Sequence, residues 1–592
     1  MVTKQREFRL PIRTKLCYNT TVILRNMVRH MNNENIKAKG RWQRSRLVPG
    51  LTLSLALSFL LGLYAPLELY FTNITEFQFD FRALLPPLLG LFGMIFAACI
   101  LGFGLCNLIH RKLYDLALLV GGMGYVIAYV HGMFLVGSLP PLDGTDFSWS
   151  DYNKETIISL LVCAAVVLVF ILLTRFLHWK NMRKVITGIS LFFTAILAVT
   201  VVTVGITNDG FQKKPLMAVT KNAEFEMSSD KNMVIFLMDA VDSKALRQLM
   251  NGDDPEYAQT LEDFTYYPNT VGAYSFTEHS IPYILTGQWF ENKEPFSDYT
   301  ARAMADSPLL QTLKAEDYRI GMYEEDLRCT EEQALEFENV EKTTLRFTSF
   351  PAIAKEELKL VWFKYAPYLL KRLVHVDMNR FSMIVEPNSD SELFHYVNWD
   401  FYPDAKDAKI TTVSDKVFKF IHIEGAHVPL RYDKNVNIIG SDQGTYDQNV
   451  QASMTILKQY LDDLKEAGVY DNTAIVVMAD HGYWTYWDDK LLGRSNPLLA
   501  VKGIGERHEM SISEAPISYE DLQECYARLL DGKSSDQVFD AKEGDQRIRR
   551  YLSYNYLEEG HIVEYEQKGY ATDLSTMIPT GRVFDAATND GT

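Results

Sequence analysis

The chain has 592 residues and a net charge of −16, which is unevenly spread: residues 1–48 carry +10, residues 49–207 carry none and residues 208–592 carry −26. The length exceeds one ordinary domain, and the acidic C-terminal part argues against nucleic-acid binding, which needs a basic face. The six cysteines form no CxxC pair or dense framework, so a disulfide-stapled or cysteine-bound zinc domain is not expected. A disulfide between Cys329 and Cys525 stays open as an alternative.

A basic tail over residues 1–48 precedes five apolar stretches, each long enough to cross the hydrocarbon core of a bilayer. The first stretch follows this long tail and lacks a small-residue cleavage site, so it does not resemble a cleaved signal peptide. We therefore predict a transmembrane domain over residues 49–207. Its predicted spans are Leu51–Phe71, Leu84–Cys106, Leu116–Leu135, Ile157–Thr174 and Ile186–Ile206.

The loops between these stretches predict the orientation. Short loops rich in Lys and Arg stay in the cytoplasm, and here the tail and the loops at residues 111–112 and 175–184 are basic, whereas the intervening loops are acidic. This pattern puts the N-terminus in the cytoplasm, and an odd number of crossings puts everything after Asn208 outside. The helices are either an anchor alone or also shape the path of a lipid substrate, and the sequence leaves both open.

The pattern changes after residue 207. Residues 208–230 are polar and irregular, which indicates a linker. Continuous apolar runs then end at Asp239, at His422 and at Asp480, and each predicts a buried parallel strand. Between the last two, residues 449–467 have helical spacing. Strands alternating with helices predict a doubly wound α/β domain over residues 231–592, closed by a C-terminal β-hairpin.

Potential ligands follow these strands at the edge where open α/β sheets bind their ligands. Asp239, Asp480 and His481 stand at strand ends. His422 ends the run that begins at residue 417, and His427 lies in the loop after it. Carboxylate oxygens and imidazoles together suit Zn²⁺ or Mn²⁺, which lowers the pKa of a nearby hydroxyl. A buried structural histidine remains an alternative for His422.

Two further residues are candidates for the same site. Thr277 lies in a loop that leads into a predicted helix, whose first NH groups would favour a bound phosphate. Arg494 has the planar guanidinium that holds phosphate oxygens, although a surface salt bridge explains it as well.

These residues carry a resemblance to a known family. The segment Thr277-x-x-Ser280-x-Pro282 resembles the nucleophile segment of phosphoethanolamine transferases, and Leu285-Thr286-Gly287 resembles the tripeptide that follows the sulfatase nucleophile. The stretch from Tyr446 to Gly482 is similar to lipoteichoic acid synthases. The chain thus resembles the lipoteichoic acid synthase and phosphoethanolamine transferase branch of the sulfatase (alkaline phosphatase) superfamily.

The resemblance implies a role for each matching position. Asp239, Thr277, Asp480 and His481 match metal ligands, Thr277 also matches the nucleophile, and His422 and His427 match a histidine pair beside the substrate phosphate or a second metal. Three positions depart from the pattern. Asp239 stands where the two transferase families usually have Glu, Ile281 stands where sulfatases have Arg, and residue 277 is not Cys, which makes sulfate-ester hydrolysis a weaker expectation.

The expected protein is a multi-pass enzyme of a bacterial cell membrane with an extracellular alkaline-phosphatase-like (sulfatase-like) α/β domain. It would use Zn²⁺ or Mn²⁺ to move a phosphoglycerol or phosphoethanolamine headgroup from a phospholipid donor, through a phosphothreonine, onto a cell-surface glycan or teichoic polymer. A membrane-bound phosphodiesterase, phosphatase or sulfatase that uses water as acceptor is the main alternative. A non-catalytic lipid-binding relative is the other.

Overall fold

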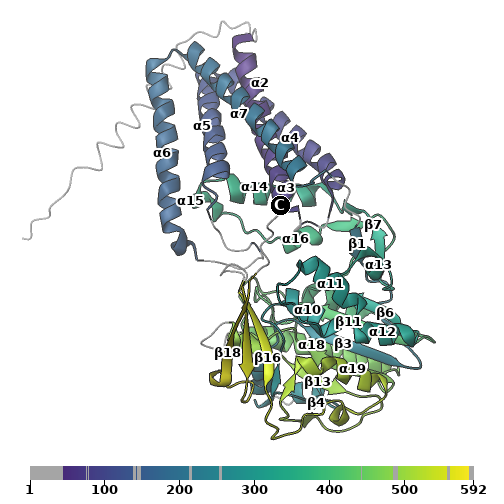
Figure 1. Ribbon diagram of the computed structural model, residues 1–592. Coiled ribbons are helices and arrows are strands. Elements are labelled where there is room, and N and C mark those ends of the chain that lie inside the picture. The colour runs from purple at the N-terminus through teal and green to yellow at the C-terminus, as the bar shows by residue number, and fades with distance from the viewer. Residues whose placement is uncertain are drawn as a thin grey trace, which may run out of the picture.

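The computed structural model describes residues 44–585 except residues 75, 76, 78, 138–141, 143–147, 212–215, 253–255, 442, 484–490 and 556–560. Most of the predicted basic tail, residues 1–43, lies outside the described part. Figure 1 shows a bundle of long helices at one end, an α/β domain at the other, and short helices between them.

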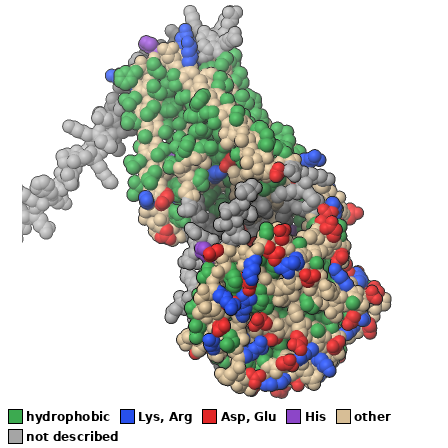
Figure 2. All heavy atoms as spheres, viewed as in Figure 1, with side chains coloured by type: hydrophobic (Ala, Val, Ile, Leu, Met, Phe, Trp, Pro, Cys, Tyr) green, Lys and Arg blue, Asp and Glu red, His purple; other side chains and the backbone are tan. Residues whose placement is uncertain are grey.

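Five helical spans in the described residues are long and apolar enough to cross a membrane, which confirms the predicted number. The first is continuous through α2, a π-helical turn η1 and α3; at its centre Gly62 lies so close to α4 that an added Cβ would be 2.8 Å from Phe92 Cα. The outward side chains of the bundle are largely hydrophobic, as Figure 2 shows. The bounds are α2 Arg44–Phe59, η1 Leu60–Tyr64, α3 Ala65–Thr72, α4 Phe81–Ile109, α5 Arg111–Phe134, α6 Asn153–Phe176 and α7 Trp179–Thr207.

The α/β domain is built on a seven-stranded sheet of order β14-β4-β13-β12-β3-β11-β6. Its four strands β12, β3, β11 and β6 run parallel, and β3, β11 and β12 are buried along their whole length, as expected for a sheet covered on both faces. The predicted fold class is therefore confirmed. The strands are β3 Asn232–Met238, β4 Thr265–Tyr266, β6 Arg319–Tyr323, β11 Val417–Ile423, β12 Thr473–Met478, β13 Leu499–Lys502 and β14 Ser511–Ile512.

The helices that pack around this sheet form two groups. Within each group the helices contact one another. One comprises α8 (Ser243–Met250), α9 (Glu256–Thr260), α17 (Asn398–Asp407) and α18 (Tyr446–Glu466). The other comprises α10 (Thr277–Thr286), α11 (Phe296–Ala305), α12 (Pro308–Ala315) and α19 (Leu522–Leu530). The helix predicted from residue 449 begins three residues earlier, because Thr445 and Gln448 form a capping box.

Two predicted segments differ from the structure. The C-terminal hairpin is a three-stranded sheet of β16 (Arg549–Asn555), β17 (His561–Gln567) and β18 (Met577–Phe584). The third strand was missed because Pro579 and Gly581 are poor strand residues. The predicted linker contains β1 (Leu216–Val219), paired with β7 (Val340–Thr343), and β2 (Glu226–Ser228), paired with β10 (Thr411–Val413). Strands of three or four residues whose partners lie far away in the sequence give no local sequence pattern from which they could be predicted.

Residues 345–387, here called the docking segment, leave the α/β domain and pack into the core of the membrane helices. Ile353, Leu360, Val361 and Phe381 belong to the same buried cluster as residues of α2, α4 and α5. The segment contains the short hairpin strands β8 (Leu345–Phe347) and β9 (Val385–Pro387), with α13 (Glu331–Ala334) before it. Its helices are α14 Phe350–Tyr365, α15 Tyr368–Lys371 and α16 Asn379–Ser382.

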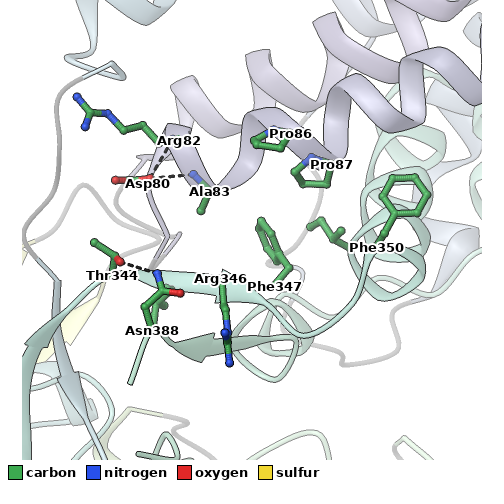
Figure 3. A pocket seen from close by; sticks show the side chains of 12 residues that line it. Asp80, Arg82, Ala83, Pro86, Pro87, Thr344, Arg346, Phe347, Phe350 and Asn388 are labelled. Atoms are coloured by element: carbon green, nitrogen blue, oxygen red, sulfur yellow. Dashed lines mark hydrogen bonds between the residues drawn. The ribbon is translucent and has the colours of Figure 1, made fainter. Parts of the chain in front are cut away.

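Polar contacts fix the docking segment to the bundle. Lys364 Nζ is 2.5 Å from Glu68 Oε2, and the backbone NH of Tyr368 donates to Ser159 Oγ at 3.1 Å. Figure 3 shows a cavity of about 630 Å³ at one side of this junction, where the start of α4, capped by Asp80, faces Phe347 and Phe350 of the segment. The sequence did not predict this docking, because periodicity does not say what a helix packs against.

The closest approach at this junction gives a prediction. A Cβ added to Gly132 of α5 would lie 2.1 Å from Tyr365 Cε1, so Gly132→Ala should force α14 away from the bundle and destabilise the docking by about 1–3 kcal/mol. We expect faster cleavage of the docking segment in limited proteolysis of the purified full-length protein. Gly124→Ala on the same helix is the matched control, because nothing lies within 4 Å of its added Cβ; equal cleavage of both variants would contradict the packing described.

Candidate active site

The strand register brings the predicted residues together. Leu237 of β3 pairs with His422 of β11 on one side and with Met478 of β12 on the other. The three parallel strands therefore end at the same level, and the residues that follow β3 and β12, Asp239 and Asp480, emerge side by side at the carboxyl edge of the sheet. Asp480 Oδ1 accepts the backbone NH of Ala240 at 3.0 Å, which fixes its orientation toward the end of β3.

Asp239, Asp480 and His481 form a cluster whose potential ligand atoms all lie within 4.8 Å of one another. His481 Nε2 is 3.3 Å from Asp480 Oδ2 and 3.8 Å from Asp239 Oδ1. The three residues are at most 3% exposed, and these two carboxylate oxygens have no hydrogen-bond partner among the described residues. Two buried carboxylates with unused oxygens beside an imidazole fit a divalent cation such as Zn²⁺ or Mn²⁺.

The two carboxylates of the cluster are buried close together, so charge and burial both affect the pKa values of its residues. Burial and the charge of Asp239 both raise the pKa of Asp480. Burial alone would also raise the pKa of Asp239, but His427 and His422 outweigh it and hold that pKa below its usual range. Burial, and then the charge of Arg494, lower the pKa of His481, which favours the neutral imidazole that a metal requires.

The backbone of the loop after β11 approaches the backbone of Asp239 closely. The loop after β11 runs against Asp239, with the NH of Ala426 donating to Asp239 O at 2.8 Å. Gly425 has φ +60°, and a Cβ there would lie 2.4 Å from that same oxygen, so glycine is required at this position. The loop that carries His427 is thereby held beside Asp239.

Thr277 is the first residue of α10, and its Oγ1 lies 3.4 Å from His481 Nε2. The helix ends at Gly287, whose φ of 68° is the left-handed conformation that glycine adopts at a helix C-terminus. Because residues at the start of a helix have free backbone NH groups, an anion bound at Thr277 meets the positive end of α10. The structure thus brings the predicted hydroxyl to the predicted cluster.

The two histidines lie on the other side of Asp239. His422 Nδ1 is 2.6 Å from Glu324 Oε2, and its Nε2 is 3.7 Å from Asp239 Oδ2. Burial lowers the pKa of His422, but Glu324 and Asp239 outweigh it and raise this pKa well above its usual value. His427 is half-buried, and its Nδ1 is 2.6 Å from Val428 O. His422 is therefore buried between two carboxylates rather than within an apolar core.

Arg494 is buried, at 9% exposure, which disfavours the surface salt bridge left open by the sequence. Its Nη1 donates to Ser275 O at 2.9 Å, and its guanidinium carbon lies 4.3 Å from the centre of the Phe276 ring. Both contacts are to the segment directly before Thr277. Cys329 and Cys525 are free thiols, so the disulfide left open by the sequence is absent from the structure.

One side of the site was missed by sequence reasoning. A cavity of about 230 Å³ adjoins Thr277 and is bounded by Glu324, Asp326 and Arg328, which follow the parallel strand β6. The rule that ligands follow strand ends would have found them, but the β6 sequence includes Arg319 and Gly321 and is not a continuous apolar run. Glu278 also lines this cavity, as its place beside Thr277 suggests.

The Sulfatase family model matches residues 231–503. Similar solved structures include a protein in the alkaline phosphatase superfamily from Vibrio parahaemolyticus (12% identity, 62% of this chain and 81% of that chain, TM-score 0.33). A phosphonate monoester hydrolase from Silicibacter pomeroyi is also similar (13% identity, 60% and 89%, TM-score 0.32). No curated protein matches significantly.

The finer resemblance to lipoteichoic acid synthases and phosphoethanolamine transferases rests on the short motifs alone. The broader assignment to the superfamily is supported by the family match, by the parallel sheet and by the buried cluster of potential metal ligands at the carboxyl edge of that sheet. Residues 231–503 form a domain of the sulfatase (alkaline phosphatase-like) superfamily.

Proposed function

We propose that this protein is a metal-dependent transferase that moves a phospholipid headgroup, phosphoglycerol or phosphoethanolamine, onto a cell-surface glycan or teichoic polymer. The observation that carries the proposal is the position of Thr277 Oγ1, 3.4 Å from His481 Nε2 within the cluster of buried metal-ligand residues. The helix bundle supports the lipid as donor, because the docking segment joins the catalytic domain directly to the membrane helices.

The reaction has two balanced steps. Thr277 Oγ forms a bond to phosphorus as its proton leaves, and the bond from phosphorus to the diacylglycerol oxygen breaks, so that this oxygen takes up a proton. The hydroxyl oxygen of the acceptor then forms a bond to phosphorus as its proton leaves, the bond from phosphorus to Thr277 Oγ breaks, and this Oγ takes up a proton. Asp239, Asp480, His481 and Thr277 would hold the divalent ion, which when bound lowers the pKa of the threonine hydroxyl and offsets phosphoryl charge.

The remaining residues of the site have roles that follow from their positions. Arg494 lies against the segment before Thr277, so its guanidinium is placed to hold a phosphoryl oxygen. His427 and His422 lie beside Asp239, where they can steady oxygens or give a proton to the leaving group. A hydrolase would use the same residues with water as acceptor. The basic tail and basic loops support a cytoplasmic N-terminus and an extracellular catalytic domain in a bacterial cell membrane.

Replacement of the nucleophile tests the covalent step. Thr277→Ala should abolish both the phosphorus-linked adduct and diacylglycerol release, by on the order of 10³-fold or more, because the attacking hydroxyl is removed. Thr277→Ser keeps the hydroxyl and should retain part of the activity. Peptide mass spectrometry after incubation of the full-length protein with phospholipid vesicles and Mn²⁺ or Zn²⁺ measures the adduct. Diacylglycerol released by Thr277→Ala at the wild-type rate would refute the nucleophile. In a second incubation that also contains a purified cell-surface glycan, headgroup released into water instead of onto the glycan would identify a hydrolase.

Metal removal tests the ligand cluster without relying on activity. In the chelated wild type, Asp239 and Asp480 repel each other, and metal at 100 times its Kd should add about 2.7 kcal/mol of stability. Asp480→Asn should lose this response, while its chelated form should be at least as stable as the chelated wild type because one buried like charge is gone. Elemental analysis and thermal unfolding of the purified protein measure both effects.

The exposed residue Asp531 provides the matched control for that experiment. Asp531→Asn should bind metal and respond to it as the wild type does. A metal content in Asp480→Asn equal to that of the control would show that the ion lies elsewhere.

A further inference from the structure

A cavity of about 690 Å³ lies where the docking segment meets the ends of the membrane helices. Its described lining comes from α3, from the chain after α5 and from the docking segment. The helix α14 contacts α3 and α5, and α15 contacts α6, so the docking helices lie across one end of the bundle (Figure 1). Because the spans through α3 and α5 end here, the cavity lies at the level of the bilayer surface, where the phosphates of lipid headgroups are.

Positive charge exceeds negative charge in this cavity. Its described lining includes two lysines, Lys364 and Lys371, but a single carboxylate, that of Glu68. Glu68 is paired with Lys364, whose Nζ lies 2.5 Å from Glu68 Oε2. No carboxylate among the described residues forms an ion pair with Lys371, and the charged group that affects its pKa is Lys364, which has the same sign. One ammonium charge, that of Lys371, is therefore not matched by a carboxylate.

Lys371 is 0% exposed, and burial together with the charge of Lys364 lowers its pKa to about 8. Its Nζ donates to the backbone oxygen of Phe363 and, at 2.8 Å, to that of Lys364, so it caps the last turn of α14. The rings of Phe363 and Tyr368 have their centres 5.5 and 5.1 Å from this nitrogen. Carbonyls and rings offer only partial charges, and the two carbonyls use two of the three ammonium donors. A buried cation in this position is stabilised further by an anion that takes the third donor.

The rest of the lining indicates which anion suits the cavity. Most of it is apolar and includes Leu69, Val136, Leu142, Leu360, Phe363 and Met378. An inorganic anion gains nothing from such a wall, whereas the hydrocarbon next to the phosphate of a phospholipid is removed from water there. A buried ammonium and an apolar wall at the level of the bilayer surface therefore match a phospholipid better than a free anion.

We propose that this cavity is a binding site for the phosphate group of a phospholipid, and that Lys371 holds its charge. None of its described lining residues belongs to the cavity beside Thr277 or to the metal-ligand cluster, so the site is separate from the active site. The inference does not depend on the transferase proposal. A lipid bound here contacts α3 and the docking segment together, and it therefore stabilises the docking of the catalytic domain on the membrane helices.

Binding of phosphatidylglycerol to the full-length protein tests the site. The protein is purified in a nonionic detergent and kept with a chelator, so that no metal-dependent reaction consumes the lipid, and native mass spectrometry measures the lipid bound at increasing concentrations. Lys371→Gln should weaken the tightest binding step roughly tenfold or more, because its amide still donates to the carbonyls of α14 but has no charge. Lys371→Arg keeps the charge and should retain most of the affinity. Diacylglycerol, which lacks the phosphate, should bind the wild type more weakly by a similar factor.

Lys355→Gln is the matched control, since it removes the same charge from an exposed position of α14 outside the cavity lining and should leave the affinity unchanged. Equal affinity of the wild type and Lys371→Gln, or equal binding of diacylglycerol and phosphatidylglycerol, would overturn the site. Displacement of the lipid by an equal concentration of inorganic phosphate would show a site for free anions and would overturn the lipid as its occupant. If Lys371→Gln does not fold, the comparison of phosphatidylglycerol, diacylglycerol and inorganic phosphate on the wild type decides alone.

Discussion

The catalytic domain is organised around two carboxylates that the sheet forces together. Asp239 and Asp480 follow neighbouring parallel strands in register, and both are almost completely buried. Among the residues that the structure describes, only imidazoles form salt-bridge contacts with them. Like charges at such depth are tolerated only when opposite charge surrounds them. His422 and Arg494 supply part of that charge, and a divalent ion held by Asp239, Asp480 and His481 would supply the rest.

The site divides into a rigid part and an adjustable part. The metal-ligand residues come from the ends of fully buried central strands, whose position is fixed by hydrogen bonds on both sides. The cavity next to Thr277 is formed instead by α10 and by the loop after the edge strand β6. Edge strands and loops tolerate substitution better than a sheet centre. The residues that line this cavity can therefore vary while the cluster of potential metal ligands is kept.

The sequence alone was sufficient for the parts of the fold that have strong local patterns. The central strands ending at Asp239, His422 and Asp480 were predictable because a buried parallel strand is a continuous apolar run, and Asp480-His481-Gly482 marks one strand end chemically. Glu324 escaped detection because β6 is an edge strand with a mixed sequence. The packing of the docking segment was not predicted for a different reason. Amphipathic periodicity shows that a helix has a buried face but not which surface covers that face.

That segment determines how the membrane and the active site are connected. Arg431, on the loop after β11, lies 3.8 Å from Asp377 of the docking segment and 3.4 Å from Glu424. Glu424 in turn accepts the backbone NH of His427 through its carbonyl oxygen, at 3.1 Å. A displacement of the segment relative to the sheet must therefore stretch contacts that end at a histidine beside Asp239. A flexible tether would have no such contacts, whereas here the docking segment is joined through Arg431 and Glu424 to the loop that carries His427.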